Sequence, residues 1–182
     1  RAQAIIVGED LGTVPAGVRR ELRRRRLLST RLALFERKPP ERYPRQSFAG
    51  VTTHDLPTIA GIWSGADLAD QRVAGVEADA SGMDDLRARL SRAAGLTMES
   101  SAEEVTVALH RRLAQAPPAL VAATLEDALG VEERPNVPGT VAPQRPNWSI
   151  ALPMSIEAIS TDQRVAMLVD ALGRSSESVP SD

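Results

Sequence analysis

The chain has 182 residues, a hydrophobic content of 42%, a charged content of 25% and a formal net charge of -2. This composition is typical of a folded globular domain and excludes a chain that is disordered throughout. The absence of cysteine excludes disulfides and thiolate metal sites and is consistent with a reducing compartment, so we expect a cytoplasmic location. The apolar stretches are far shorter than the roughly 20 residues of a membrane span, so no membrane partner is expected.

The first expected element is a strand at 4–10 ("AIIVGED"), followed by a helix at 13–25 with Thr13 as its N-cap. Residues 1–45 carry twelve Lys or Arg against five Asp or Glu. The arginine run at 19–26 raises the alternative of a nucleic-acid-binding protein, because clustered arginines neutralise phosphates. Apolar residues at helical spacing and the lack of interleaved aromatics favour a solvated helix face, so no nucleic acid is expected.

Two more strands are expected at 30–37 and 47–55, separated by a proline-rich loop, and a helix is expected to open at 56–63. Residues 65–118 have a helical pattern, with a glycine stop at Gly95 and a capping box formed by Ser101 and Glu104. His110 lies beside two arginines, so we expect it on an exposed helix face. Residues 119–127 are predicted to form a fourth buried strand, although periodicity alone does not separate this run from a helix.

Strands that alternate with helices predict a parallel sheet with right-handed crossovers. Glu9 and Asp10 end the first apolar run, and His54 and Asp55 end a later one. Because the carboxyl ends of parallel strands form the active face of such folds, we expect the two acidic pairs to converge. Paired carboxylates that face a shared cleft are typical of glycoside chemistry, with one acid and one stabilising or nucleophilic carboxylate.

Four motifs occur in series: "GEDLG" (8–12), "THDLPT" (53–58), "RPNVPGT" (134–140) and "PNW" (146–148). In this order they resemble the C-terminal half of the 4-alpha-glucanotransferases, the amylomaltases or disproportionating enzymes of the alpha-amylase clan. The resemblance implies the C-terminal half of a (β/α)8 barrel with a helical insertion and parallel strands. The expected domains are barrel elements with the acidic motifs at 1–64, a helical insertion at 65–118, a final strand with the NVPGT loop and closing segment at 119–172, and a disordered tail at 173–182.

The resemblance also implies a role for each site residue. Glu9 would be the general acid/base, and Asp55 would stabilise the distorted sugar without attacking it. His54 would hydrogen-bond the same sugar, while Asp10 and Asn136 would line neighbouring subsites. The implied reaction transfers segments of alpha-1,4-glucan or maltooligosaccharide between chains with retention, without a metal or an organic cofactor.

The nucleophile of this family is an Asp on the strand before that of Glu9, a position upstream of Arg1. We therefore expect the chain to belong to a longer enzyme, to require the missing N-terminal half as its partner, and to lack turnover alone. A non-catalytic glucan-binding module is the alternative.

Purely structural roles for single residues also stay open. Asp55 could cap the following helix, Asn136 could shape a turn, and Trp63 and Trp148 either stack on sugars or pack inside the fold. A metal-binding role for His54 is disfavoured, because the chain has one other histidine.

Overall fold

The computed structural model describes residues 4–173, which contain a four-stranded sheet in the order β1-β2-β3-β4. The strands are β1 (Val7–Gly8), β2 (Leu28–Leu32), β3 (Ser47–Gly50) and β4 (Leu120–Val121). Every pairing is parallel. The predicted α/β fold with a parallel sheet is therefore confirmed.

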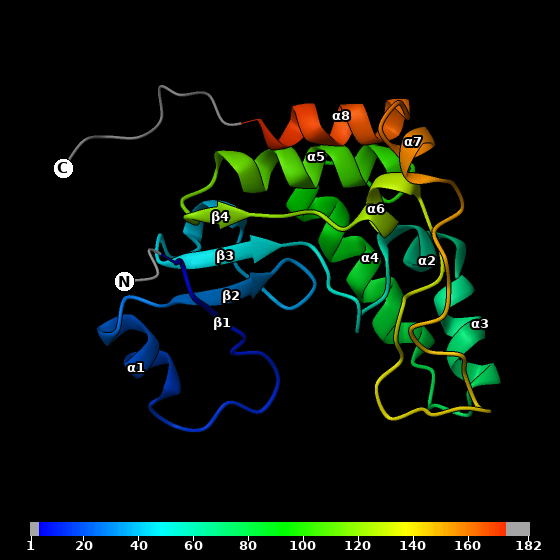
Figure 1. Cartoon of the computed structure of the whole chain (residues 1–182), viewed down its shortest axis with the longest axis horizontal. Coiled ribbons are helices and arrows are strands. Elements are labelled where there is room, and N and C mark those ends of the chain that lie inside the picture. The colour runs from blue at the N-terminus through cyan, green and yellow to red at the C-terminus, as the bar shows by residue number, and fades with distance from the viewer. Residues whose placement is uncertain (1–3, 174–182) are drawn as a thin grey trace.

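Helices cover one face of this sheet and also lie at one end of it. Helix α1 (Val18–Arg24) joins β1 to β2, whereas the β2–β3 connection contains only a 3-10 turn, Pro40–Arg42. The β3–β4 connection holds α2 (Ile59–Ser64), α3 (Ala66–Val73), α4 (Ala80–Ala94) and α5 (Ala102–Gln115). After β4 come α6 (Leu125–Leu129), α7 (Ile156–Ile159) and α8 (Gln163–Leu172). In Figure 1, α5 lies along the sheet with α8 above it, and α2, α3 and α4 lie beyond the carboxyl ends of the strands.

Several helix boundaries follow from the local sequence. The predicted capping box is confirmed: the Ser101 hydroxyl accepts from the Glu104 N–H (3.2 Å), and the Glu104 carboxylate accepts from the Ser101 N–H (2.8 Å). Gly95 ends α4 in the left-handed conformation, as predicted. The predicted cap at Thr13 is wrong, because α1 begins only after Gly17, whose φ of 93° turns the chain into the helix.

The strands are shorter than their apolar runs. The Phe35 and Glu36 N–H groups both donate to the Leu32 carbonyl (2.9 Å each), so a turn ends β2 well before residue 37. The strand predicted for 119–127 is correct only at Leu120–Val121. Thr124 then caps α6 by accepting from the Asp127 N–H (3.2 Å), so the second half of this run is helical.

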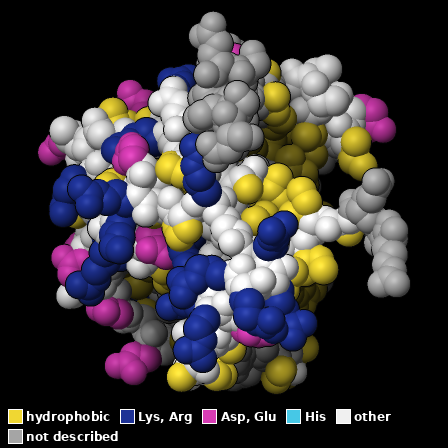
Figure 2. Space-filling view, turned by 90° about the vertical axis from the view of Figure 1, so that its left-hand side faces the viewer, with side chains coloured by type: hydrophobic (Ala, Val, Ile, Leu, Met, Phe, Trp, Pro, Cys, Tyr) yellow, Lys and Arg dark blue, Asp and Glu magenta, His cyan; other side chains and the backbone are white. Residues whose placement is uncertain are grey.

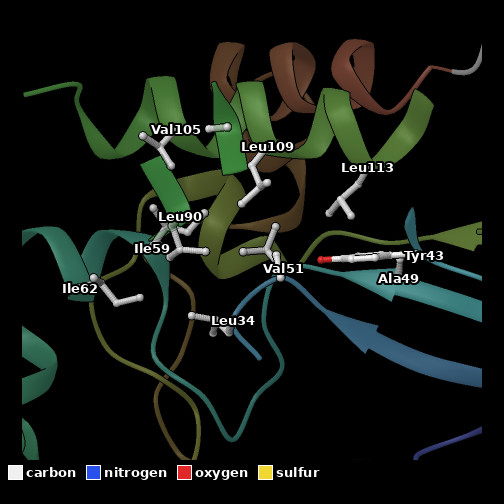
Figure 3. Packing of buried hydrophobic residues seen from close by; sticks show 12 residues of the cluster. Leu34, Tyr43, Ala49, Val51, Ile59, Ile62, Leu90, Val105, Leu109 and Leu113 are labelled. Atoms are coloured by element: carbon white, nitrogen blue, oxygen red, sulfur yellow. The ribbon is translucent and has the colours of Figure 1, made fainter. Parts of the chain in front are cut away.

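The main core joins α5 to the sheet and to the helices beyond it. Figure 3 shows Leu109 and Leu113 of α5 above Val51, with Ile59 of α2 beside them. Each buried Leu, Val or Ile side chain contributes about 1.5–3 kcal/mol of burial free energy. Because Val51 and Ile59 are both buried, the turn between them, which carries His54 and Asp55, is anchored at each end.

The other face of the sheet is less covered by the described residues. Ala49 packs in the α5 core, so Phe48 points to the opposite face, where its register partners are Thr30 and Leu120. The Leu120 and Val7 side chains are exposed. Within residues 4–173, β1 and β4 each pair with one neighbour, which leaves one open backbone edge on each.

The remaining expectations concern the ends of the chain and membranes. Residues 174–182, nearly all of the predicted tail, lie outside the described residues. None of the helices in residues 4–173 has the length and apolar character needed to cross a membrane.

Candidate active site

Three of the predicted site residues meet at the turn after β3. The Asn136 side chain donates from Nδ2 to Oδ1 of Asp55 (2.7 Å), and the Asn136 backbone N–H donates to the His54 carbonyl (3.0 Å). His54 Nε2 lies 3.4 Å from the same Asp55 Oδ1. The Asp55 side chain is 38% exposed, and its second carboxylate oxygen has no hydrogen-bond partner among the described residues. His54, Asp55 and Asn136 thus lie together, although about eighty positions of sequence separate Asn136 from the other two.

The buried side chain of Arg134 holds the backbone of the turn that carries His54 and Asp55. Arg134 donates from Nη1 to the Asp55 carbonyl (3.0 Å), and from Nε and Nη2 to the two carboxylate oxygens of Asp67 (2.7 Å each). The side chains of Arg134 and Asp67 are only 8% and 1% exposed. Since Asp67 belongs to α3, this helix fixes the backbone of the Asp55 turn.

A second Arg-Pro-Asn tripeptide repeats this arrangement eleven residues later along the same loop. Arg145 donates to Asp70 of α3 (2.7 Å) and to the Arg134 carbonyl (2.6 Å). Asn147 accepts from the Val137 N–H (3.1 Å) and donates to the Thr140 hydroxyl (2.8 Å). The NVPGT loop is therefore closed by its own hydrogen bonds and attached twice to α3.

Trp148 follows this second tripeptide and presents its ring to solvent. The residue is 63% exposed, and its ring centroid lies 4.8 Å from that of His54 at an interplanar angle of 52°. The φ of Trp148 is 62°, an unfavourable value for a bulky residue, held by an N–H bond to the Pro135 carbonyl (2.9 Å). Strain of this kind is concentrated at functional sites. Trp63 differs, because its indole N–H donates to the Ser100 carbonyl (2.8 Å) and its ring packs under Arg87.

Glu9 directly follows β1 and is exposed. Among residues 4–173, nothing forms a hydrogen bond or ion pair with its carboxylate. Glu9 follows the carboxyl end of β1, and the His54–Asp55 turn follows that of β3. These two strands are not neighbours, because β2 lies between them in the sheet. Their convergence on one sugar stays a prediction.

Asp10 is buried and bound by three protein donors. Its carboxylate accepts from the Thr30 N–H (2.7 Å) and from Arg19 Nε (2.9 Å), with Arg31 Nη1 at 3.4 Å. These bonds join β1 to β2 and neutralise the buried charge. Asp10 also lines an open cavity of about 310 Å³ together with Arg31 and Phe35, so its contact with a sugar stays a prediction.

Comparison with known proteins identifies the family to which this site belongs. A family model described as 4-alpha-glucanotransferase matches residues 1–155. The chain belongs to the 4-alpha-glucanotransferase family. The resemblance carried by the four motifs is thereby confirmed.

Relatives in this family are longer than the chain. A 4-alpha-glucanotransferase of Mycobacterium tuberculosis (strain ATCC 25618 / H37Rv) is 36% identical over 199 residues, covering 94% of this chain but 27% of that protein. One from Haemophilus influenzae is 28% identical, covering 90% and 26%. The chain thus spans about a quarter of the length of these relatives.

Solved structures of 4-alpha-glucanotransferase relatives have the same fold. An amylomaltase from Corynebacterium glutamicum has a TM-score of 0.82 and 26% identity, covering 94% of this chain and 29% of that one. An amylomaltase from Streptococcus agalactiae in complex with acarbose has a TM-score of 0.65 at 19% identity, covering 91% and 30%.

In this 4-alpha-glucanotransferase chain, one open alternative for Asp55 is excluded and one expectation for His110 is wrong. Asp55 does not cap α2, because Thr58 does so by accepting from the Gly61 N–H (3.0 Å). His110 is fully buried rather than exposed. Its Nδ1 donates to the Thr106 carbonyl (2.8 Å), its Nε2 has no partner among the described residues, and burial lowers its pKa to about 4.

The arginine run forms a solvated surface, as predicted. Figure 2, which faces α1 and the amino ends of the strands, shows Lys and Arg side chains gathered there. Arg24 and Arg25 both bind Glu21, at 2.6 and 2.7 Å, and their side chains are exposed. Pairs of this kind contribute little to stability.

Sequence reasoning missed the supporting arginines Arg134 and Arg145 and their aspartate partners. The available signal was the repeated Arg-Pro-Asn tripeptide, together with two aspartates three positions apart on one predicted helix. Such a spacing places both acids on the same helix face. None of the groups of His, Asp and Glu in residues 4–173 has three members placed to hold a metal ion.

Proposed function

We propose that the chain supplies the acid/base and stabilising groups of a 4-alpha-glucanotransferase that transfers alpha-1,4-glucan segments with retention. The observation that carries this proposal is the hydrogen bond from Asn136 to Asp55, which places an accessible carboxylate beside His54 in a chain of this family. A carboxylate held in this way can bind sugar hydroxyls and stabilise positive charge at the anomeric carbon.

Glu9 is the proposed general acid/base. Its protonated form donates a proton to the glycosidic oxygen as the bond to the anomeric carbon breaks. The resulting carboxylate then removes a proton from the incoming sugar hydroxyl, so the residue ends each cycle as it began. The exposure of Glu9 and its lack of a partner in residues 4–173 support this role, because the carboxyl is free to approach a substrate.

Asp55 is the proposed stabiliser. Asn136 occupies its Oδ1, which leaves Oδ2 to accept hydrogen bonds from the sugar. The negative charge favours the oxocarbenium-like transition state more than the neutral substrate, which is the condition for catalysis. Arg134 does not touch the substrate in this scheme and acts through the Asp55 backbone.

His54 and Trp148 form the proposed wall of the sugar site. The exposed His54 ring can donate a hydrogen bond, and the Trp148 indole beside it offers an apolar face of the size of a pyranose. Asp10 and Asn136 are assigned to neighbouring subsites. A complex with acarbose is known for the related Streptococcus agalactiae amylomaltase, which supports a glucan substrate here.

The proposed enzyme is a (β/α)8 barrel of which residues 1–64 and 119–172 form the final part, with 65–118 as the helical insertion. The open edges of β1 and β4 and the exposed side chains opposite α5 support a barrel completed by a preceding segment. That segment would supply the nucleophilic aspartate. The chain alone is therefore expected to be inactive.

The experiment measures glucose release from maltotriose by the full reading frame that contains this chain. Glu9→Gln should lower the transfer rate by about 10²–10⁴-fold, the usual contribution of a general acid/base. Glu77→Gln, on an exposed glutamate, is the matched control and should leave the rate unchanged. Equal rates for the two variants, or robust turnover by the 182-residue chain alone, would refute the proposal.

A glucan-binding module without catalysis is the second candidate, favoured by the exposed Trp148 ring beside His54. It predicts maltooligosaccharide binding that is lost in Trp148→Ala, together with no transfer by the full reading frame. Transfer that depends on Glu9 excludes it.

A further inference from the structure

The guanidinium of Arg145 is enclosed by its own loop and by α3. Its Nε donates to Asp70 of α3 (2.7 Å), and its Nη2 donates to the Arg134 carbonyl (2.6 Å). Its Nη1 donates to the side-chain oxygen of Asn147 (2.8 Å) and to the Pro135 carbonyl (3.4 Å). Because the Arg145 side chain is only 3% exposed, it has almost no surface with which to touch a substrate. Any effect of Arg145 on the site must therefore pass through the groups that it holds.

Two of those groups fix the backbone of Trp148. The Trp148 N–H donates to the Pro135 carbonyl (2.9 Å), which is the same oxygen that accepts from Arg145. Asn147, the residue before Trp148, is bound to Arg145 through its side chain. The φ of Trp148 is 62°, and a bulky residue keeps such a value only where its surroundings hold it there. Arg145 supplies two of these restraints.

The orientation of the Trp148 ring depends on this backbone. Trp148 is 63% exposed and does not belong to the buried core cluster, so the core does not orient its ring. The ring lies beside that of His54, with the two centroids 4.8 Å apart. A change in the φ of Trp148 would therefore move the ring away from His54.

The two Arg-Pro-Asn tripeptides thus hold different parts of the site. In the first, Arg134 and Asn136 both bind Asp55, a charged group. In the second, Arg145 binds the groups that hold Trp148, an apolar ring. A charge acts most strongly on the charge that develops in the transition state, whereas an apolar surface binds a sugar similarly before and during the reaction. The first tripeptide should therefore affect turnover, and the second should affect binding.

We propose that Arg145 is a positioning residue that fixes the Trp148 ring as the binding surface for one glucose unit, and so sets the affinity for glucan. This inference rests on the proposed function of the chain in glucan transfer. Loss of binding that is equal in the ground state and the transition state raises KM and leaves kcat nearly unchanged. Arg145→Met in the full-length enzyme should raise the KM for maltotriose about tenfold, the order of one aromatic contact, and change kcat by less than about twofold.

Binding is measured separately from turnover, by calorimetry with maltotriose and the full-length Glu9→Gln protein, which should bind the sugar without transferring it. In this background, Arg145→Met and Trp148→Ala should each weaken binding about tenfold. The double variant should bind no more than about twofold more weakly than Trp148→Ala, because Arg145 acts through that ring. Arg72→Met, which removes an exposed arginine of α3, is the matched control and should not change the affinity.

A failure of Arg145→Met to fold is covered by Arg145→Lys. The ammonium can still pair with Asp70, but it lacks the planar fork that also reaches Pro135 and Asn147, so the same loss of affinity is expected together with cooperative urea unfolding. Unchanged affinity in both variants, additive effects in the double variant, a fall in kcat at constant KM, or no binding of maltotriose would overturn the inference. Transfer that does not depend on Glu9 would instead refute the proposed function, and the calorimetric result would still stand.

Discussion

Arg134 and Asp67 form a two-point ion pair, with both N–O distances at 2.7 Å, deep in the interface between α3 and the loop that carries Asn136. The same guanidinium holds the Asp55 carbonyl, so one side chain links a helix, a loop and the proposed catalytic turn. Removing one partner of such a pair leaves the other charge buried and alone.

Arg134→Met should destabilise the protein by about 3–5 kcal/mol, the usual cost of breaking a buried ion pair from one side. Urea unfolding measures the change. Asp67→Leu combined with Arg134→Met should cost less than the sum of the single changes, because no lone charge remains. Arg24→Met, which removes an exposed pair with Glu21, is the control and should have little effect. Equal destabilisation by Arg134→Met and Arg24→Met would contradict the expectation.

Asn136→Asp should place a second carboxylate within hydrogen-bond distance of Asp55. Two carboxylates this close repel each other, and the N–H···O bond that now holds the Asp55 side chain is lost. We expect at least a tenfold loss of transfer by the full-length enzyme at pH 7. The pH–rate profile gives the measurement. Gln144→Glu adds the same charge elsewhere on this loop and should leave the profile unchanged; matching profiles for the two variants would argue against the role of Asn136.

His110 should make the fold sensitive to mild acid. Its pKa is lowered from 6.5 to about 4 by burial, so the fold favours the neutral ring. The stability it contributes is complete above pH 6.5 and is lost as the pH falls towards 4. Between pH 7.5 and 5 the loss should be on the order of 2 kcal/mol. Urea unfolding of His110→Leu should lack this component, and parallel pH curves for the two proteins would show the prediction to be wrong.

Asp127 should act in the opposite direction. Its pKa is raised from 3.8 to about 6, chiefly by burial, so the fold favours the protonated carboxyl. Its contribution to stability is complete below pH 3.8 and is lost as the pH rises through 6. Asp127→Asn should therefore gain on the wild type by up to about 3 kcal/mol between pH 4 and pH 7.5. Chemical unfolding at both pH values tests this, with Glu133→Gln, on an exposed glutamate, as the control; a gap that stays constant with pH would count against it.

The sequence predicted those features whose cause is local. The capping box at Ser101 and Glu104 and the stop at Gly95 depend on a few neighbouring residues, and both were correct. The family followed from four motifs that come as a set. The α/β class followed from the alternation of apolar runs.

Features that depend on distant partners could not be predicted in this way. His110 sits beside two arginines in sequence, yet it is buried. Thr13 is a good N-cap by type, yet the turn at Gly17 decides where α1 begins. The pairing of Arg134 with Asp67 spans 67 positions. The repeated Arg-Pro-Asn tripeptide and the two aspartates three positions apart are visible in the sequence, but neither pattern shows that it pairs with the other.

Helix α3 sets the spacing between the two points at which the loop of residues 134–148 is attached. Asp67 and Asp70 each hold one arginine of that loop, and the three-residue interval between them sets where the two arginines attach. One inserted residue between the aspartates would turn the second about 100° around the helix axis and detach its arginine. Insertions or deletions between Asp67 and Asp70 should therefore disrupt the loop. Substitutions on the exposed side of the same helix, where Val73 lies, should not.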